Sequence, residues 1–236
     1  MSSGPNPRKF RAMSVHIFTA LGAICGLAAC LAAANGQWTW VWWWLGAALL
    51  VDGVDGPLAR KYDIKNELPM WNGSSLDYVI DFSTYVFIPA FALALSDLMP
   101  TPWGWVAAGI VTLAGAMYYA YDDMKLPDNC FRGFPAAWNI PVLLFFIYKP
   151  DPMIIMAVIV ALAGLSFTPL RFIHPVRVTR HRVLTLVMIG IWGLSLVGAL
   201  IYDLNPPVWL LWVIGLSTAY VSLIGLYLQA TEPTTK

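Results

Sequence analysis

Two short segments, 52-DGVDGPLAR-60 and 73-GSSLDYVID-81, carry four aspartates in a chain that otherwise avoids charge. Hydrophobic residues make up 59% of the 236 residues, and charged residues make up only 11%. A carboxylate near the middle of a bilayer costs about 2.5 kcal/mol or more. Four converging carboxylates therefore need a compensating partner, and divalent cations are the natural one.

The apolar runs around these segments predict an all-α, polytopic membrane bundle that forms a single domain over residues 1–236. A membrane-spanning helix needs about 20 apolar residues. About eight segments approach that length: 15–34, 38–59, 77–97, 102–121, 134–149, 152–170, 183–203 and 207–229. The fifth is the shortest and contains two prolines, Pro135 and Pro141.

The basic residues predict the orientation of this bundle. Of the 14 lysines and arginines, all except Lys149 would lie on one side of the membrane. The positive-inside rule makes that side cytoplasmic. Both termini and the aspartate segments are then cytoplasmic. The net charge of +1 gives no indication of a nucleic-acid partner.

The spacing of the aspartates predicts one shared site. On an α-helix, Asp52 and Asp55 lie about 60° apart, and Asp77 and Asp81 lie about 40° apart. Each pair therefore shares a helical face, and the two pairs lie at similar depth on antiparallel neighbours. Carboxylates from two facing helices suit two hard cations, and oxygen ligands favour Mg²⁺ or Mn²⁺.

The residues beside the aspartates indicate phosphoryl chemistry. Gly56 and Gly73 remove side chains where a bulky ligand must approach closely. Arg60 is placed to meet a phosphate. Metals, an arginine and bare backbone together favour a pyrophosphate-like substrate. The alternative is a proton or cation transporter, which should show repeats or broken helices in both halves of the chain. Here the acidic cluster is confined to the second and third predicted spans.

The whole pattern, Asp52-x2-Asp55-Gly56-x2-Ala59-Arg60-x12-Gly73-x3-Asp77-x3-Asp81, resembles the signature of the CDP-alcohol phosphotransferases. These membrane enzymes move a phosphate-bearing group from a CDP-linked donor to an alcohol. The gap between Arg60 and Gly73 is longer here than in most of that family. Segment 15–23 is similar to the first helix of the bacterial phospholipid-synthase branch, and segments 127–139 and 174–178 are similar to the enzymes of that branch that use choline as the acceptor. Serine, the acceptor of a branch that shares the first helix, stays open.

This resemblance implies roles for the signature residues. Two divalent ions, Mn²⁺ or Mg²⁺, would be held by Asp52, Asp55, Asp77 and Asp81, and Asp81 would also be the general base. The donor nucleotide would be held by Gly56, Ala59, Arg60, Gly73 and Thr19. The implied donor is CDP-diacylglycerol, which stays in contact with bilayer lipids, and the implied product is CMP. The resemblance also implies the inner membrane of a bacterium, with the site facing the cytoplasm, and suggests a homodimer.

Choline would need a site of its own. A quaternary ammonium has no N–H to donate, so aromatic faces and carboxylates are the available chemistry. The candidates by position are Tyr78, Tyr85, Tyr119, Asp122, Trp138 and Asn139. Interfacial tyrosines and tryptophans are also ordinary in membrane proteins. His16 is interpreted as a packing residue of the first helix rather than as a ligand.

Overall fold

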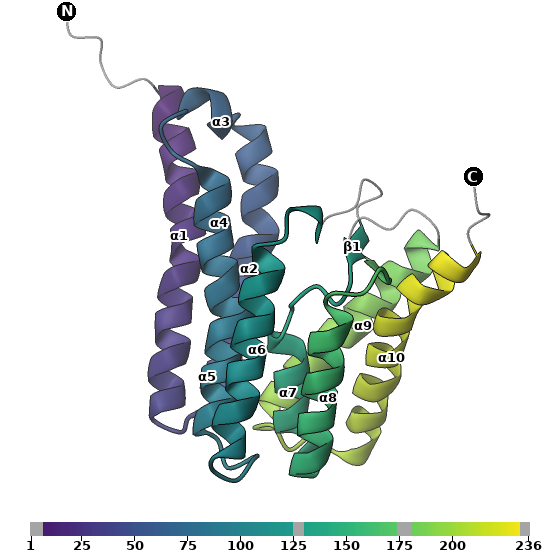
Figure 1. Cartoon of the computed structure of the whole chain (residues 1–236). Coiled ribbons are helices and arrows are strands. Elements are labelled where there is room, and N and C mark those ends of the chain that lie inside the picture. The colour runs from purple at the N-terminus through teal and green to yellow at the C-terminus, as the bar shows by residue number, and fades with distance from the viewer. Residues whose placement is uncertain (1–6, 125–129, 174–180, 232–236) are drawn as a thin grey trace, which may run out of the picture.

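The computed structural model describes residues 7–124, 130–173 and 181–231 as a bundle of helices (Figure 1). It opens with two long helices, α1 (Pro7–Ala34) and α2 (Trp38–Lys61), which pack along each other and extend above the other helices. The one-turn helix α3 (Ile64–Glu67) follows α2 at that end. The predicted first span begins only at residue 15, so α1 continues upward through the basic residues that precede it.

The third long helix is continuous but not uniform. It consists of α4 (Gly73–Asp81), the π-helical segment η1 (Phe82–Phe87) and α5 (Ile88–Leu95). The side chain of Asn72 accepts a hydrogen bond from the Ser75 backbone N–H, which caps the start of α4. π-Helical turns widen a helix and are frequent at functional sites. This one directly follows Asp81.

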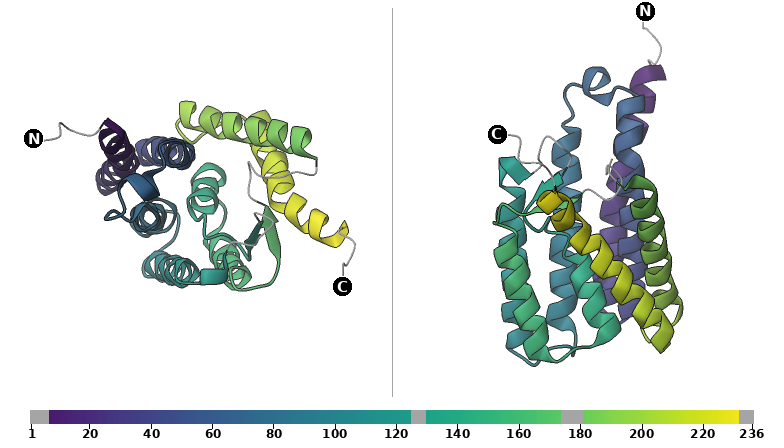
Figure 2. Two further views of the ribbon diagram at one scale, coloured as in Figure 1. Left: turned by 90° about the horizontal axis from the view of Figure 1, so that it is seen from above. Right: turned by 90° about the vertical axis from the view of Figure 1, so that its right-hand side faces the viewer.

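Helix α6 (Trp103–Tyr119) packs against this third helix, and the remaining elements complete the bundle. They are η2 (Asp122–Met124), β1 (Cys130–Arg132), α7 (Asn139–Tyr148), α8 (Pro152–Leu165), β2 (Arg171–Ile173), α9 (Arg182–Ile201) and α10 (Val208–Thr231). Seen from above, α1 and α2 are viewed almost end-on, whereas α9 and α10 run across the view, so the last two helices are tilted (Figure 2).

The predicted helical bundle is confirmed, and each of the eight predicted segments contains a helix. Within the described residues, four helices are long and apolar enough to cross a membrane: α1, the continuous α4–η1–α5, α9 and α10. Helix α6 has 17 residues, and α7 and α8 have 10 and 14, which are short for a span of about 20. The protein is therefore an integral membrane protein, and eight crossings remain a prediction.

The all-α prediction is wrong in one detail. Strands β1 and β2 form a two-stranded antiparallel sheet in which Phe131 is paired with Phe172. The two strands come from connections more than thirty residues apart, so no local pattern in the sequence could predict their pairing. Residues 127–129 and 174–178, which contributed to the family resemblance, lie outside the described residues.

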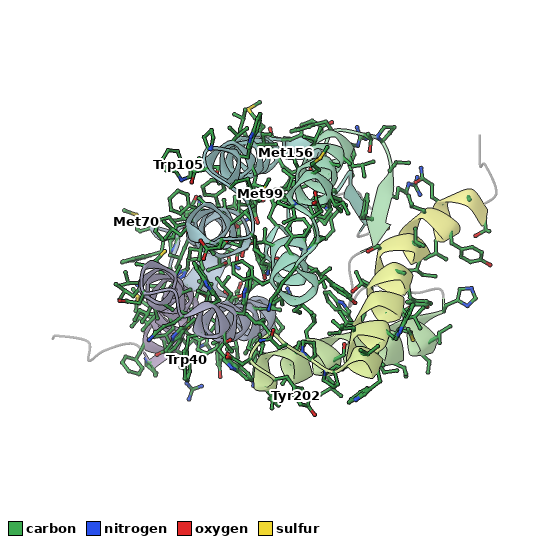
Figure 3. The ribbon with its side chains drawn as sticks, turned by 90° about the horizontal axis from the view of Figure 1, so that it is seen from below. Trp40, Met70, Met99, Trp105, Met156 and Tyr202 are labelled. Atoms are coloured by element: carbon green, nitrogen blue, oxygen red, sulfur yellow. The ribbon has the colours of Figure 1, made fainter. Side chains whose placement is uncertain are left out.

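Glycines allow the helices to approach closely around the third helix. A Cβ added at Gly22 of α1 would lie 2.8 Å from Cγ2 of Ile80, and one at Gly115 of α6 would lie 2.4 Å from Cγ1 of Val86. Small residues of this kind let membrane helices pack backbone to backbone. Seen from below, side chains fill the space among the helices, and Trp40 and Trp105 lie on the outer rim (Figure 3). Helix α1 therefore packs closely against α4 at Ile80, and α6 packs closely against η1 at Val86.

Candidate active site

Three of the four predicted metal ligands converge. Asp52 and Asp55 on α2 and Asp77 on α4 each offer a carboxylate oxygen, and these oxygens all lie within 4.8 Å of one another. Hard divalent ions take oxygen ligands at about 2.0–2.6 Å, so ligand oxygens around one ion lie up to about 5 Å apart. The separation therefore fits a shared divalent cation. Asp55 is buried, which makes an uncompensated charge there costly.

Asp81 lies one helical turn after Asp77 on α4 and is outside that three-residue group. It is nevertheless close to the same site. Two tyrosines, Tyr85 and Tyr119, lie within electrostatic range of both Asp81 and Asp52. The structure thus brings all four aspartates to one region, with Asp81 at its edge.

Tyr85 orients one of the carboxylates. Its hydroxyl donates a 2.6 Å hydrogen bond to Oδ2 of Asp52. A short bond from a phenol to a carboxylate is charge-assisted and fixes which oxygen remains for a metal ion. Tyr85 lies in the π-helical segment η1, whose wider turn changes the direction of the side chains that follow Asp81. Tyr85 was predicted from the sequence to belong to the choline site, and its hydrogen bond to Asp52 is a contact in addition to that prediction.

Thr19 of α1 plays a similar part for Asp55. Its buried side chain lies beside the Asp55 carboxylate, so α1 supports the site as well as α2 and α4. Thr19 was predicted from the sequence to bind the nucleotide, and that role stays a prediction.

Arg60 lies along α2 above these carboxylates. Its Nη1 is 3.5 Å from the point where a Cβ of Gly56 would stand, so the exposed guanidinium folds back over the glycine. Side chains on a helix point toward its N-terminus, which here is the direction of the aspartates. Ala59 faces elsewhere, because it packs against the small cluster of Ala12, Val15 and Ile64 that joins α1 to α3. Its role is thus also structural.

Gly73 and His16 fit against each other. A Cβ at Gly73 would lie 3.1 Å from Cε1 of His16, so the glycine leaves room for the imidazole. His16 is only 6% exposed, and its ring lies 6.0 Å from that of Trp71. His16 thus packs inside the bundle, as interpreted from the sequence, but it lies against Gly73, so a role beside the nucleotide stays a prediction. Its Nε2 has no hydrogen-bond partner within the described part of the chain.

The predicted choline residues separate into two groups. Tyr78 and Tyr119 lie together, with ring centroids 6.2 Å apart, beside the carboxylates. Trp138 is fully buried against Phe134, and Asn139 is 7% exposed. Neither the Trp138 Nε1 nor the Asn139 Oδ1 has a partner among the described atoms. The remaining candidate, Asp122, is exposed in η2.

The sequence analysis missed one aromatic residue of this region. Phe82 packs against Tyr119 with ring centroids 6.1 Å apart and an interplanar angle of 85°. Phe82 follows Tyr78 by four residues, which places both on one helical face. That spacing was the available signal, but a phenylalanine in an apolar helix does not stand out.

Comparison with known proteins is consistent with this geometry. The family model described as CDP-alcohol phosphatidyltransferase matches residues 14–170. A Brucella melitensis protein named phosphatidylcholine synthase is 44% identical over 93% of this chain and 79% of its own length. Proteins of the same name from Rhizobium meliloti and Pseudomonas aeruginosa are 41% and 40% identical. These matches cover 94% and 79% of this chain, and 92% and 79% of the two relatives.

Proposed function

Since this chain belongs to the CDP-alcohol phosphatidyltransferase family, we propose that it is a phosphatidylcholine synthase. The reaction transfers the phosphatidyl group of CDP-diacylglycerol to choline and releases CMP. The observation that carries the proposal is the convergence of Asp52, Asp55 and Asp77 on one point between α2 and α4. The acceptor, choline, is inferred from the name phosphatidylcholine synthase that these relatives carry. A transporter with a carboxylate cluster does not account for the family match.

The carboxylates would hold the metal. The oxygens of Asp52, Asp55 and Asp77 fit one divalent ion, and Asp81 beside them supplies a further ligand for a second. Mn²⁺ or Mg²⁺ suits an all-oxygen ligand set. When bound, such ions polarise a phosphate and stabilise the charge of a departing phosphate group.

The remaining steps belong to residues of this chain. Asp81 accepts the proton of the choline hydroxyl. The choline oxygen forms a bond to the phosphorus that carries diacylglycerol, and the bond from that phosphorus to the CMP oxygen breaks. Arg60, folded over Gly56, binds a donor phosphate. Thr19 and Tyr85 keep the carboxylates of Asp55 and Asp52 in position.

The membrane setting follows from the same signals. We propose about eight crossings with both termini in the cytoplasm, in the inner membrane of a bacterium, because nearly all basic residues lie on one side. The site then faces the cytoplasm, where choline is dissolved, while the acyl chains of the donor stay in the bilayer. We treat residues 1–236 as one domain. The exposed apolar side chains of α9 and α10 would contact lipid or, in a homodimer, a second copy.

The test is CMP release by the purified protein in mixed micelles. CDP-diacylglycerol and Mn²⁺ are supplied with choline, serine, inositol or glycerol phosphate in parallel, each with and without excess chelator. Chelator-sensitive release with choline alone is the expected result. Release with serine instead of choline would support the proposed metal site but would show that choline is not the acceptor. The absence of release with every acceptor, from protein shown to be folded, would overturn the proposal.

A further inference from the structure

We propose that the quaternary ammonium of the acceptor binds against the aromatic rings of Tyr78, Phe82 and Tyr119, here named the Tyr119 cluster. This inference rests on the proposed function and specifies how the site recognises choline. It selects three rings from the aromatic residues of the cytoplasmic half of the protein. It adds Phe82, which the sequence analysis did not consider, and it leaves out Trp138.

The geometry of the three rings forms a corner around Tyr119. The Tyr78 and Tyr119 rings meet at an interplanar angle of 74°, and the Phe82 and Tyr119 rings meet at 85°. The centroids are 6.2 and 6.1 Å apart. Rings at nearly right angles present faces in different directions. A cation within about 6 Å of a ring centroid is attracted by the face of that ring.

Packing holds this corner rigid on one side and leaves it open on the other. Tyr118 is 2% exposed in the core, and its ring lies 6.5 Å from that of Tyr119 at an angle of 81°. Tyr118 therefore supports Tyr119 from behind. Tyr78 is 38% exposed, and Phe82 and Tyr119 are half-buried. Tyr78 is thus the most exposed of the three rings, and the proposal takes its side of the cluster as the approach of the cation.

The Tyr119 cluster also lies next to the chemistry. Tyr78 directly follows Asp77 and Phe82 directly follows Asp81 on the third helix, and the Tyr119 ring packs against both aromatic rings. Choline is short, so an ammonium against these rings leaves its hydroxyl near the proposed base. Two divalent ions would balance the four carboxylates, and the donor pyrophosphate would add negative charge. A cationic acceptor is therefore favoured when the donor is bound.

The same chemistry explains the choice of acceptor. A trimethylammonium group has no N–H to donate, so it cannot form the hydrogen bonds that serine and primary amines make with carboxyl or amide groups. Aromatic faces attract it without requiring a hydrogen bond. Trp138 offers a larger face, but it is fully enclosed by protein and packs edge-on against Phe134. A cation cannot reach it in this arrangement.

The experiment compares four variants of the full chain in mixed micelles: Tyr119→Leu, Tyr119→Phe, Phe82→Leu and Phe87→Leu. Phe87 is the matched control, because it lies in the same π-helical segment, undergoes the same change and is 48% exposed outside the Tyr119 cluster. The quantities measured are the KM for choline, the KM for CDP-diacylglycerol and the inhibition constant of tetramethylammonium. That inhibitor carries the cation without the hydroxyl.

We expect Tyr119→Leu and Phe82→Leu to raise the KM for choline and the tetramethylammonium inhibition constant together, by about 2- to 30-fold. The KM for CDP-diacylglycerol should stay within about twofold, since the donor nucleotide does not use these rings. Tyr119→Phe keeps the aromatic face but loses the hydroxyl, so it should raise the KM for choline far less than Tyr119→Leu does. Phe87→Leu should leave both KM values within about twofold of wild type.

Three results would overturn the inference. If the wild type uses choline but neither leucine variant exceeds the effect of Phe87→Leu, the inference fails and the proposed function stands. If the donor KM rises as much as the choline KM, these rings shape the whole site and do not specify the cation. If the wild type releases no CMP with choline, the proposed function fails and the inference fails with it.

Discussion

Replacement of Gly22 by alanine should damage catalysis from a position outside the site. The new Cβ would lie 2.8 Å from Cγ2 of Ile80, whereas carbon atoms in contact normally lie about 3.5–4.0 Å apart. Either α1 and α4 separate by about 0.7 Å or more, or Ile80 moves. Ile80 is only 6% exposed, so it has little room. Overpacking of this kind costs about 1–3 kcal/mol of stability.

The effect on activity follows from the position of Ile80 beside Asp81 in α4. A displacement of α4 moves Asp77 and Asp81 relative to the carboxylates of α2. A misplacement of about 1 Å can cost about 100-fold in rate, so we expect Gly22→Ala to lower kcat/KM by about 10- to 100-fold. CMP release at saturating Mn²⁺ measures the rate, and thermal unfolding in detergent measures the stability.

Two further variants make this prediction specific. Gly46→Ala is the control, because no atom lies within 4 Å of its new Cβ, and alanine is the better helix former. Ile80→Ala removes the methyl group that clashes, and the next atom, Cγ1 of Val51, is 4.0 Å from the new Cβ. The double variant Gly22→Ala/Ile80→Ala should therefore have a higher kcat/KM than the value obtained by multiplying the fold losses of the two single variants. Wild-type activity of Gly22→Ala, or strict additivity in the double variant, would refute the reasoning.

Three other substitutions test the site directly. Tyr85→Phe removes the hydrogen bond to Asp52 and should raise the Mn²⁺ concentration for half-maximal CMP release by about 10- to 100-fold. An unchanged Mn²⁺ concentration would contradict the role given to Tyr85. Asp81→Asn should lower kcat by about 10²- to 10⁴-fold while donor binding, followed by CMP or CDP-diacylglycerol titration, falls much less; equal losses would count against a base. Arg60→Ala should raise the donor KM by about 10- to 100-fold through loss of a charge-assisted phosphate contact, and a donor KM like that of wild type would remove Arg60 from the phosphate site.

Much of the fold could be predicted because the membrane simplifies the problem. Long apolar runs must be helical where lipid surrounds them, since their backbone groups have no other partners. The helices α1, α2, α9 and α10 accordingly lie close to the predicted segments 15–34, 38–59, 183–203 and 207–229. The ends of the shorter helices α7 and α8 are harder to predict, because prolines and turns interrupt the apolar pattern there.

The π-helical segment and the small sheet were not predictable by the same reasoning. Residues 82–87 have the sequence pattern of an ordinary apolar helix, whereas in the structure they form a π-helical segment whose Val86 packs against Gly115 of α6. The pairing of β1 with β2 joins distant parts of the chain. Both features depend on contacts between elements, on which local sequence carries little information.

The sequence by itself predicted that Asp52, Asp55 and Asp77 meet, and the structure brings these three together. The spacing of Asp52, Asp55, Asp77 and Asp81 fixes a helical face for each pair, because helical periodicity is a property of the backbone. The tertiary structure decided how the groups are used. It placed Tyr85 beside Asp52 and Thr19 beside Asp55. It brought Tyr78 and Phe82 of the third helix against Tyr119 of α6. It also buried Trp138 in the core, where a cation has no access to its ring. These outcomes depend on the close approach of helices at Gly22 and Gly115, since side chains from different helices meet only when the backbones pack closely.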